Sequence, residues 1–174
     1  MEPQHLARRT VIRASAWSVP VVAVAATAPA YAASPLGAQL TFNTANVFGA
    51  DYAGSRPKKL ESNVQVQNSY YAGAPTVTSL ILTVSYPKTV VGGGAATSVS
   101  GVGWSYTSVA SSGTQWVYRF DWVGTAAPGG NTGTMVFRVP IVNPYPGAVP
   151  VTPSFTASAS GGTALAAPSY TLPS

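Results

Sequence analysis

The sequence contains few residues that could carry out catalytic chemistry. It has no cysteine, and its single histidine is His5, close to the N-terminus. Beyond residue 32 the acidic residues are Asp51, Glu61 and Asp121. A serine or cysteine nucleophile needs a histidine to activate it, and protein zinc sites are built largely from His and Cys. We therefore expect no catalytic centre, no metal site and no cofactor, and a protein that is not an enzyme.

One enzymatic alternative stays open in this composition. Glycoside hydrolysis needs two carboxyl groups that flank the scissile bond, and folding could bring two of the three acids together. Their wide spacing does not suggest a calcium site, which usually needs clustered oxygen ligands. The glycine run at residues 92–94 lacks the Gly-Lys-Ser/Thr ending of phosphate-binding loops. We expect this run to be a flexible link.

Residues 116–122 form an aromatic row, Trp-Val-Tyr-Arg-Phe-Asp-Trp. Successive side chains along a strand point to opposite faces, so the four rings share one face and Arg119 and Asp121 share the other. The preferred interpretation is a wall of the hydrophobic core, because exposed apolar patches of this size are rare in soluble monomers. We expect Arg119 and Asp121 to be solvated or paired across strands.

The alternative for the aromatic row is a flat surface on which sugar rings stack. In that interpretation the row, together with an aromatic residue upstream, forms a candidate ligand platform. Its residues are Trp104, Trp116, Tyr118 and Trp122.

The N-terminal segment has the pattern of an export signal. Basic residues precede an apolar stretch from residue 14 to about residue 28, and Ala30-Tyr31-Ala32 follows as a small-x-small cleavage site. Arg8 and Arg9, followed by Thr-Val-Ile-Arg, resemble the twin-arginine export motif. The segment is similar to leaders of exported actinobacterial proteins. Prolines interrupt the apolar stretch, so we expect cleavage after Ala32 and no stable membrane span.

The remaining composition predicts an all-β protein. Hydrophobic residues make up 46% of the chain and charged residues 7%, which argues against disorder and against solvent-facing helices. Beyond residue 32 the net charge is only +3, from six basic and three acidic residues, so we expect no nucleic-acid binding. We predict a signal peptide at residues 1–32, a first strand with a long connection at 33–61, and the remaining strands at 62–174.

Short alternating segments separated by Gly and Pro predict the strands. Residues 63–68 alternate polar and apolar side chains strictly, which places Val64 and Val66 inward. Further strands are expected at residues 76–86, 103–107, 114–123, 132–141, 151–160 and 164–172. We expect no covalent anchor in the residues after Ser160.

Several of these segments resemble the immunoglobulin-like repeat domains of bacterial surface proteins, including the cell-adhesion-related class. The resemblance rests on the strand at 63–68, Tyr86-Pro87, Gly103-Trp104, the Pro-Gly-Gly turn at 128–130 and the strand at 155–158. It implies an immunoglobulin-like β-sandwich of about seven strands. It also implies that the strands before and after the Pro-Gly-Gly turn lie in different sheets, although a simple hairpin is also compatible with the sequence.

Three functions are therefore compatible with the sequence. The preferred one is a secreted or envelope-associated, non-enzymatic domain with a structural or adhesive role at the cell surface. Its expected partners are the export translocase and then a surface protein or a cell-wall glycan. The alternatives are a carbohydrate-binding module that uses the aromatic row and a hydrolase that uses an acid pair.

Overall fold

The computed structural model describes residues 37–142 and 147–174 of the chain. One compact unit spans Pro35–Ser174, and it is the subject of all that follows. The expected signal peptide, with Arg8, Arg9, Ala30 and Ala32, lies outside the described residues.

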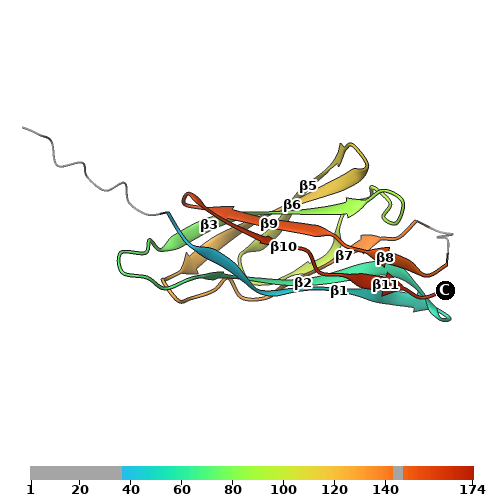
Figure 1. The fold of residues 1–174 in the computed structure, drawn as a ribbon, viewed down its shortest axis with the longest axis horizontal. Coiled ribbons are helices and arrows are strands. Elements are labelled where there is room, and N and C mark those ends of the chain that lie inside the picture. Colours follow the sequence, from blue (N-terminus) through green and yellow to red (C-terminus); the bar gives the residue numbers. More distant parts are fainter. Residues whose placement is uncertain (1–36, 143–146) are drawn as a thin grey trace, which may run out of the picture. The chain divides into compact units, whose positions relative to one another are not determined.

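The described residues fold into eleven β-strands (Figure 1). They are β1 (Leu40–Ala53), β2 (Arg56–Asn68), β3 (Val77–Pro87), β4 (Thr97–Ser100), β5 (Trp104–Ser112), β6 (Gln115–Ala126), β7 (Met135–Pro140), β8 (Val149–Val151), β9 (Ser154–Ala159), β10 (Gly162–Ala166) and β11 (Tyr170–Leu172). This part of the chain contains no helix that is long and apolar enough to cross a membrane.

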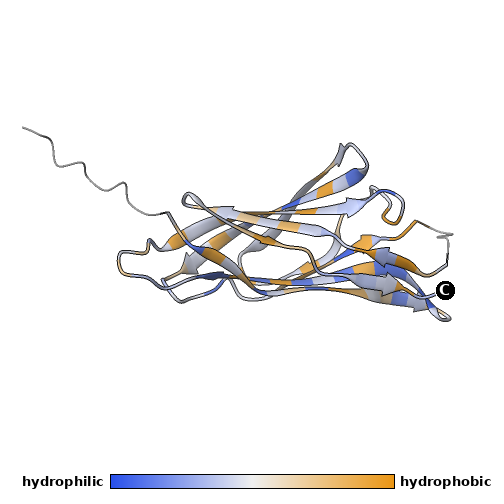
Figure 2. Ribbon diagram, viewed as in Figure 1, coloured by the Kyte–Doolittle hydropathy of each residue, from blue (hydrophilic) through white to orange (hydrophobic). Residues whose placement is uncertain are grey.

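Two antiparallel sheets form the sandwich. A four-stranded sheet has the order β1-β2-β7-β4, and a five-stranded sheet has the order β10-β9-β3-β6-β5. A small ribbon of β11 and β8 completes the fold. Hydrophobic and hydrophilic residues alternate along the strands of both sheets (Figure 2), as expected when one face of each sheet is buried and the other meets solvent.

The core lies between the two sheets, and side chains of both sheets meet in it. The rings of Phe120 on β6 and Phe137 on β7 are both fully buried, with centroids 4.4 Å apart. The hydroxyls of Ser62 on β2 and Tyr86 on β3 share a buried hydrogen bond. Burial raises the pKa of the Tyr86 hydroxyl, so this bond joins two neutral groups.

Several strand predictions are confirmed. On β2, Val64 and Val66 are buried while Gln65 and Gln67 lie on the solvent side. The segments at 103–107 and 114–123 pair as the β5–β6 hairpin. Strands β6 and β7, which precede and follow the Pro-Gly-Gly turn, lie in different sheets rather than forming a simple hairpin.

The prediction of a long connection within residues 33–61 is wrong. Residues 46–61 belong to two long strands, β1 and β2, which pair along their length from Leu40↔Asn68 to Ala53↔Arg56. The Gly and Pro in this segment suggested a loop, but they are compatible with the pairing. Pro57 lies beyond the point where β7 starts to pair with β2 at Lys59, so no ladder hydrogen bond to β7 is lost there.

The expected number of about seven strands is also too low. β4 forms in a segment that was assigned to no strand, and the segments at 151–160 and 164–172 each contribute to two different pairings. Pro153 and Pro168 lie between the strands of those two segments and separate them into short pieces.

Candidate functional site

The aromatic row forms a wall of the core. Tyr118 and Phe120 are fully buried, and Trp122 is 4% exposed. Trp104 on the neighbouring strand is 8% exposed, with its ring centroid 6.4 Å from that of Trp122. The core interpretation is therefore confirmed. The platform interpretation is wrong for Trp104, Tyr118 and Trp122, because their faces are packed against other side chains and cannot stack on sugars.

Tyr118 has a structural role that the sequence did not reveal. Its hydroxyl donates to the carbonyl oxygens of Gly92 and Gly94, each at 3.0 Å. Burial raises the pKa of this hydroxyl, which keeps it protonated and able to donate. The glycine run, which we expected to be a flexible link, is thus held against the core by a buried side chain.

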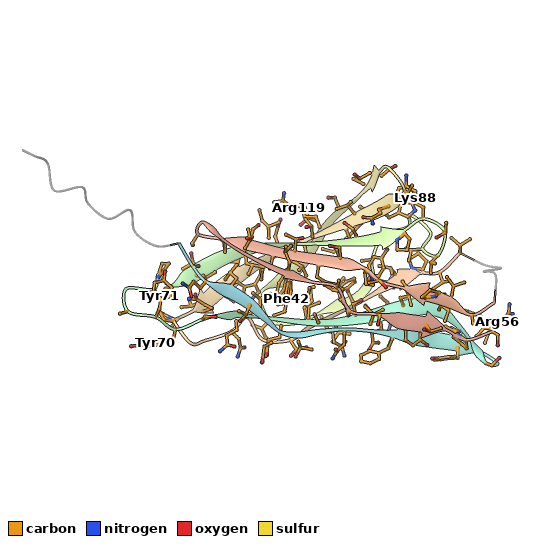
Figure 3. All side chains as sticks on the ribbon, in the orientation of Figure 1. Phe42, Arg56, Tyr70, Tyr71, Lys88 and Arg119 are labelled. Atoms are coloured by element: carbon orange, nitrogen blue, oxygen red, sulfur yellow. The ribbon has the colours of Figure 1, made fainter. Side chains whose placement is uncertain are left out.

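Trp116 is the fourth platform residue, and its ring is partly covered. A Cβ atom on Gly93 would lie 2.4 Å from Cζ2 of this ring, so the glycine backbone packs directly on it. The ammonium group of Lys88 lies 5.0 Å from the ring centroid, a cation–π distance (Figure 3). The same ammonium donates to Ser111 Oγ at 2.6 Å, which holds it in place. Trp116 is therefore the one platform residue that keeps part of its ring exposed, although no flat row of rings surrounds it.

The candidate site lies instead on the outer face of the five-stranded sheet. A hollow of about 690 Å³ crosses β3, β6 and the turn between β9 and β10. We call it the sheet groove. It is a shallow depression that is largely open to solvent. It is lined by Ile81 of β3, by Arg119, Asp121 and Val123 of β6, and by the segment 158–163, which we call its rim.

Arg119 and Asp121 supply the charged chemistry of the sheet groove. Arg119 Nε donates to Asp121 Oδ1 at 3.1 Å, and Thr107 Oγ1 donates to Asp121 Oδ2 at 2.8 Å. The sequence placed both charged residues correctly on the face opposite the rings. The pairing runs along β6 rather than across strands, because residues two apart on a strand share a face. Both side chains are partly exposed, so the pair is available to a ligand.

The rim of the sheet groove is a tight turn in a strained conformation. Ser160 has φ 47° and Gly161 has φ 79°, both in the left-handed region. A non-glycine residue in this region costs about 1–3 kcal/mol and is held there by its surroundings. Here Ala38 N donates to Ser160 O, and a Cβ atom on Gly162 would lie 1.7 Å from Ala38 O. The chain before β1 therefore fixes the shape of the rim.

A second charged cluster lies on the outer face of the four-stranded sheet. Arg138 Nη1 lies 2.9 Å from Asp51 and Nη2 lies 2.8 Å from Glu61, while Lys59 Nζ lies 2.9 Å from Asp51. We call these four residues the ion-pair cluster. Asp51 has φ 53°, a left-handed conformation that Asp tolerates better than most residues.

The ion-pair cluster brings two of the three acids together, yet it lacks the features of a hydrolase site. The hydrogen bond from Lys59 lowers the pKa of the Asp51 carboxyl. A general acid needs the opposite, a carboxyl whose pKa is raised so that it holds its proton near neutral pH. Arg138 lies against both acids and Lys59 against Asp51, so two positive charges balance the two carboxylates. The described residues contain no group of three or more metal-ligating side chains.

The geometry defines an all-β protein of two antiparallel sheets with an open groove on one outer face. No protein-family model matches the chain, and no curated protein matches its sequence. Among solved structures it is similar to the solution structure of a late embryogenesis abundant (LEA) protein, with 16% identity over 99% of this chain and 95% of that one. The TM-score is 0.29, so the likeness carries no argument about function.

Sequence reasoning missed most of the sheet groove. Arg119 and Asp121 were singled out, but only as solvated residues. Thr107 lies on β5, the hairpin partner of β6, but the rim at 158–163 begins 37 positions after Asp121, and nothing local in that segment links it to β6. A useful signal was available in the β6 alternation, because a buried aromatic face implies an exposed face that carries the two charges.

Proposed function

We propose that the protein is a secreted, non-enzymatic immunoglobulin-like domain with an adhesive or structural role at the cell surface. The order of the central strands supports the immunoglobulin-like part. Such a domain has strands A to G in two sheets, A-B-E-D and C-F-G. With β3 to β7 taken as B to F, the five-stranded sheet contains B-E-D as β3-β6-β5, and the four-stranded sheet contains C-F as β4-β7.

The outer strands depart from that pattern. β9 lies beside β3, where strand A would lie, and β2 lies beside β7, where strand G would lie. The two flanking strands have thus exchanged sheets relative to a standard immunoglobulin domain, while the five central strands keep their order.

The observation that carries the adhesive role is the sheet groove. Its charged centre is one guanidinium beside one carboxylate, so its net charge is zero and it favours neutral ligands. Its rim carries the hydroxyls of Ser158, Ser160 and Thr163, and Ile81 and Val123 add apolar surface to its lining. Hydroxyl, guanidinium and carboxylate groups all hydrogen-bond to sugar hydroxyls. These features support a cell-wall glycan as the partner, held in the groove rather than on the aromatic row.

Export is tested by changing the twin-arginine pair. We expect Arg8→Lys and Arg9→Lys together to block secretion, since the motif that we infer depends on arginine at both positions. The measurement is the amount of protein in medium, envelope and cell fractions. The control is Arg56→Lys, the same change in the folded part. Undiminished secretion of the double variant would exclude the twin-arginine route, and a wild-type protein found only inside cells would contradict the proposed location.

A further inference from the structure

Strand β5 is an open edge of the five-stranded sheet. It is nine residues long and, within the described part of the chain, pairs on one side with β6. An edge strand presents unpaired N–H and C=O groups to any other chain. Proteins usually protect such edges with charged residues, proline, short length, a covering element or a β-bulge. The sequence of β5, WSYTSVASS, has no charge and no proline, and its one irregularity is a bulge between Tyr106 and Ser108.

The other edges of the two sheets are better protected. β4 is four residues long, and β10 is five residues long. β1 is long, but it lies against β10 and also contacts β9 and β11. Figure 1 shows the β5–β6 hairpin running outward at its tip, away from β9 and β10. Among the strands that the structure describes, β5 is therefore the long edge that is open to a further strand.

We propose that β5 pairs in antiparallel fashion with β5 of a second copy of this chain, joining two five-stranded sheets into one. The lack of charge on β5 favours a second copy as the occupant. A two-fold antiparallel pair sets a strand against itself, so any charged residue near the axis would face its own like charge. Here the middle of the strand carries Ser, Thr, Val and Ala, which pair without repulsion, and the ammonium of Lys88 lies at Ser111, near the end of the strand and away from the axis.

The inner face of β5 supports the same arrangement. Tyr106 and Val109 point to the core side, opposite Phe120 and Tyr118 of β6, but they are only half-buried. A further strand at this edge would cover their exposed parts and continue the core beyond β5. The inference concerns the sheet edge and does not depend on the sheet groove or on its ligand.

A single strand-to-strand contact makes a weak dimer. Stable protein interfaces bury roughly 1,200–2,000 Å² in total, and one pair of nine-residue strands buries less than this. The dimer is therefore expected to form at high local concentration, as at a cell surface where many copies lie close together. A weak dimer of this kind is expected to have a dissociation constant of roughly 0.1–1 mM. Sedimentation analysis of the purified protein from ~10 µM to ~2 mM covers this range.

The decisive variant places a positive charge on the open edge. Ala110 is exposed on the outer face of β5, and Ala110→Lys is expected to weaken dimerisation at least ~10-fold. The matched control is Leu165→Lys, which adds the same charge at a residue of β10 that is 76% exposed. Wild type and this control should dimerise alike. A wild type that stays monomeric throughout, or an Ala110→Lys variant that dimerises as wild type does, would overturn the proposal.

A cysteine variant keeps the proposal testable if the lysine variant fails to fold. The chain has no cysteine, so an introduced one is unique. Ser108 is the middle residue of β5, and directly opposed residues in antiparallel strands lie at Cα distances that a disulfide can span. Under mild oxidation Ser108→Cys should form a covalent dimer at least ~10-fold faster than Ser154→Cys, an exposed position on the interior strand β9. Equal rates would contradict the pairing.

Discussion

Replacing Trp122 with alanine is expected to destabilise the protein by about 3–5 kcal/mol, the usual cost of removing a buried tryptophan. The ring is 4% exposed and packs beside Trp104, and its Nε1 donates to the carbonyl oxygen of Val102 at 3.1 Å. The truncation would leave a cavity in the core and remove this hydrogen bond. The loss is a large share of the ~5–15 kcal/mol that stabilises a typical domain.

Chemical denaturation followed by circular dichroism measures this loss. The control is Val123→Ala on the same strand, where the side chain is 70% exposed and the expected change is within about 0.5 kcal/mol. A Trp122→Ala variant that loses less than about 1 kcal/mol would show that the ring is not part of the core.

Replacing Gly103 with alanine is expected to have the second large effect, lowering the free energy of unfolding by about 2–4 kcal/mol. Gly103 has φ 78°, in the left-handed region that favours glycine. A Cβ atom there would also lie 2.1 Å from the carbonyl oxygen of Val123, so the backbone at the start of β5 would have to move. The variant therefore combines backbone strain with a clash that no rotamer change can relieve.

Gly113 provides a matched control for the strain component. It has φ 53° in the β5–β6 turn, and an added Cβ would meet nothing within 4 Å. Gly113→Ala should therefore cost about 1–2 kcal/mol, from the left-handed conformation only. Equal losses for the two variants, measured by the same denaturation, would show that the close contact at Gly103 contributes nothing.

Local patterns in the sequence predicted the parts of the fold that depend on local side-chain alternation. The strict alternation around Val64 and Val66 identified β2, and the aromatic row identified β6 and its buried face. These predictions succeeded because period-two alternation is a direct consequence of strand geometry. The same reasoning failed at β1, where Phe48, Asp51 and Tyr52 are all exposed and interrupt the alternation of buried and exposed side chains.

Long-range contacts account for what the sequence did not predict. The sequence showed that Tyr118 belongs to the aromatic row. Its hydrogen bonds to the carbonyl oxygens of Gly92 and Gly94, however, join residues 24 to 26 positions apart. The rim of the sheet groove depends on Ser160 meeting Ala38 across most of the chain. The ion-pair cluster needs Arg138 of β7 to reach Asp51 of β1 across β2. Such contacts are set by strand order, which no local pattern encodes.

Binding to cell-wall glycan tests the proposed function most directly. The measurement is a binding isotherm of the purified protein on an insoluble cell-wall glycan preparation, with Asp121→Ala compared with Lys88→Ala. The first change removes the carboxylate that holds Arg119 and Thr107 in the sheet groove. The second removes the ammonium beside Trp116, at the end of the aromatic row. Both changes are at exposed polar contacts, and both variants are expected to fold as wild type does.

The account predicts that wild type and Lys88→Ala bind the glycan alike, and that Asp121→Ala binds at least ~10-fold more weakly, a loss of about 1.4 kcal/mol. Binding by Asp121→Ala at wild-type strength would contradict the assignment of the site to the outer face of the five-stranded sheet. Loss of binding in Lys88→Ala alone would move the site to the aromatic row. A wild-type protein that does not bind the glycan would contradict the proposed partner itself.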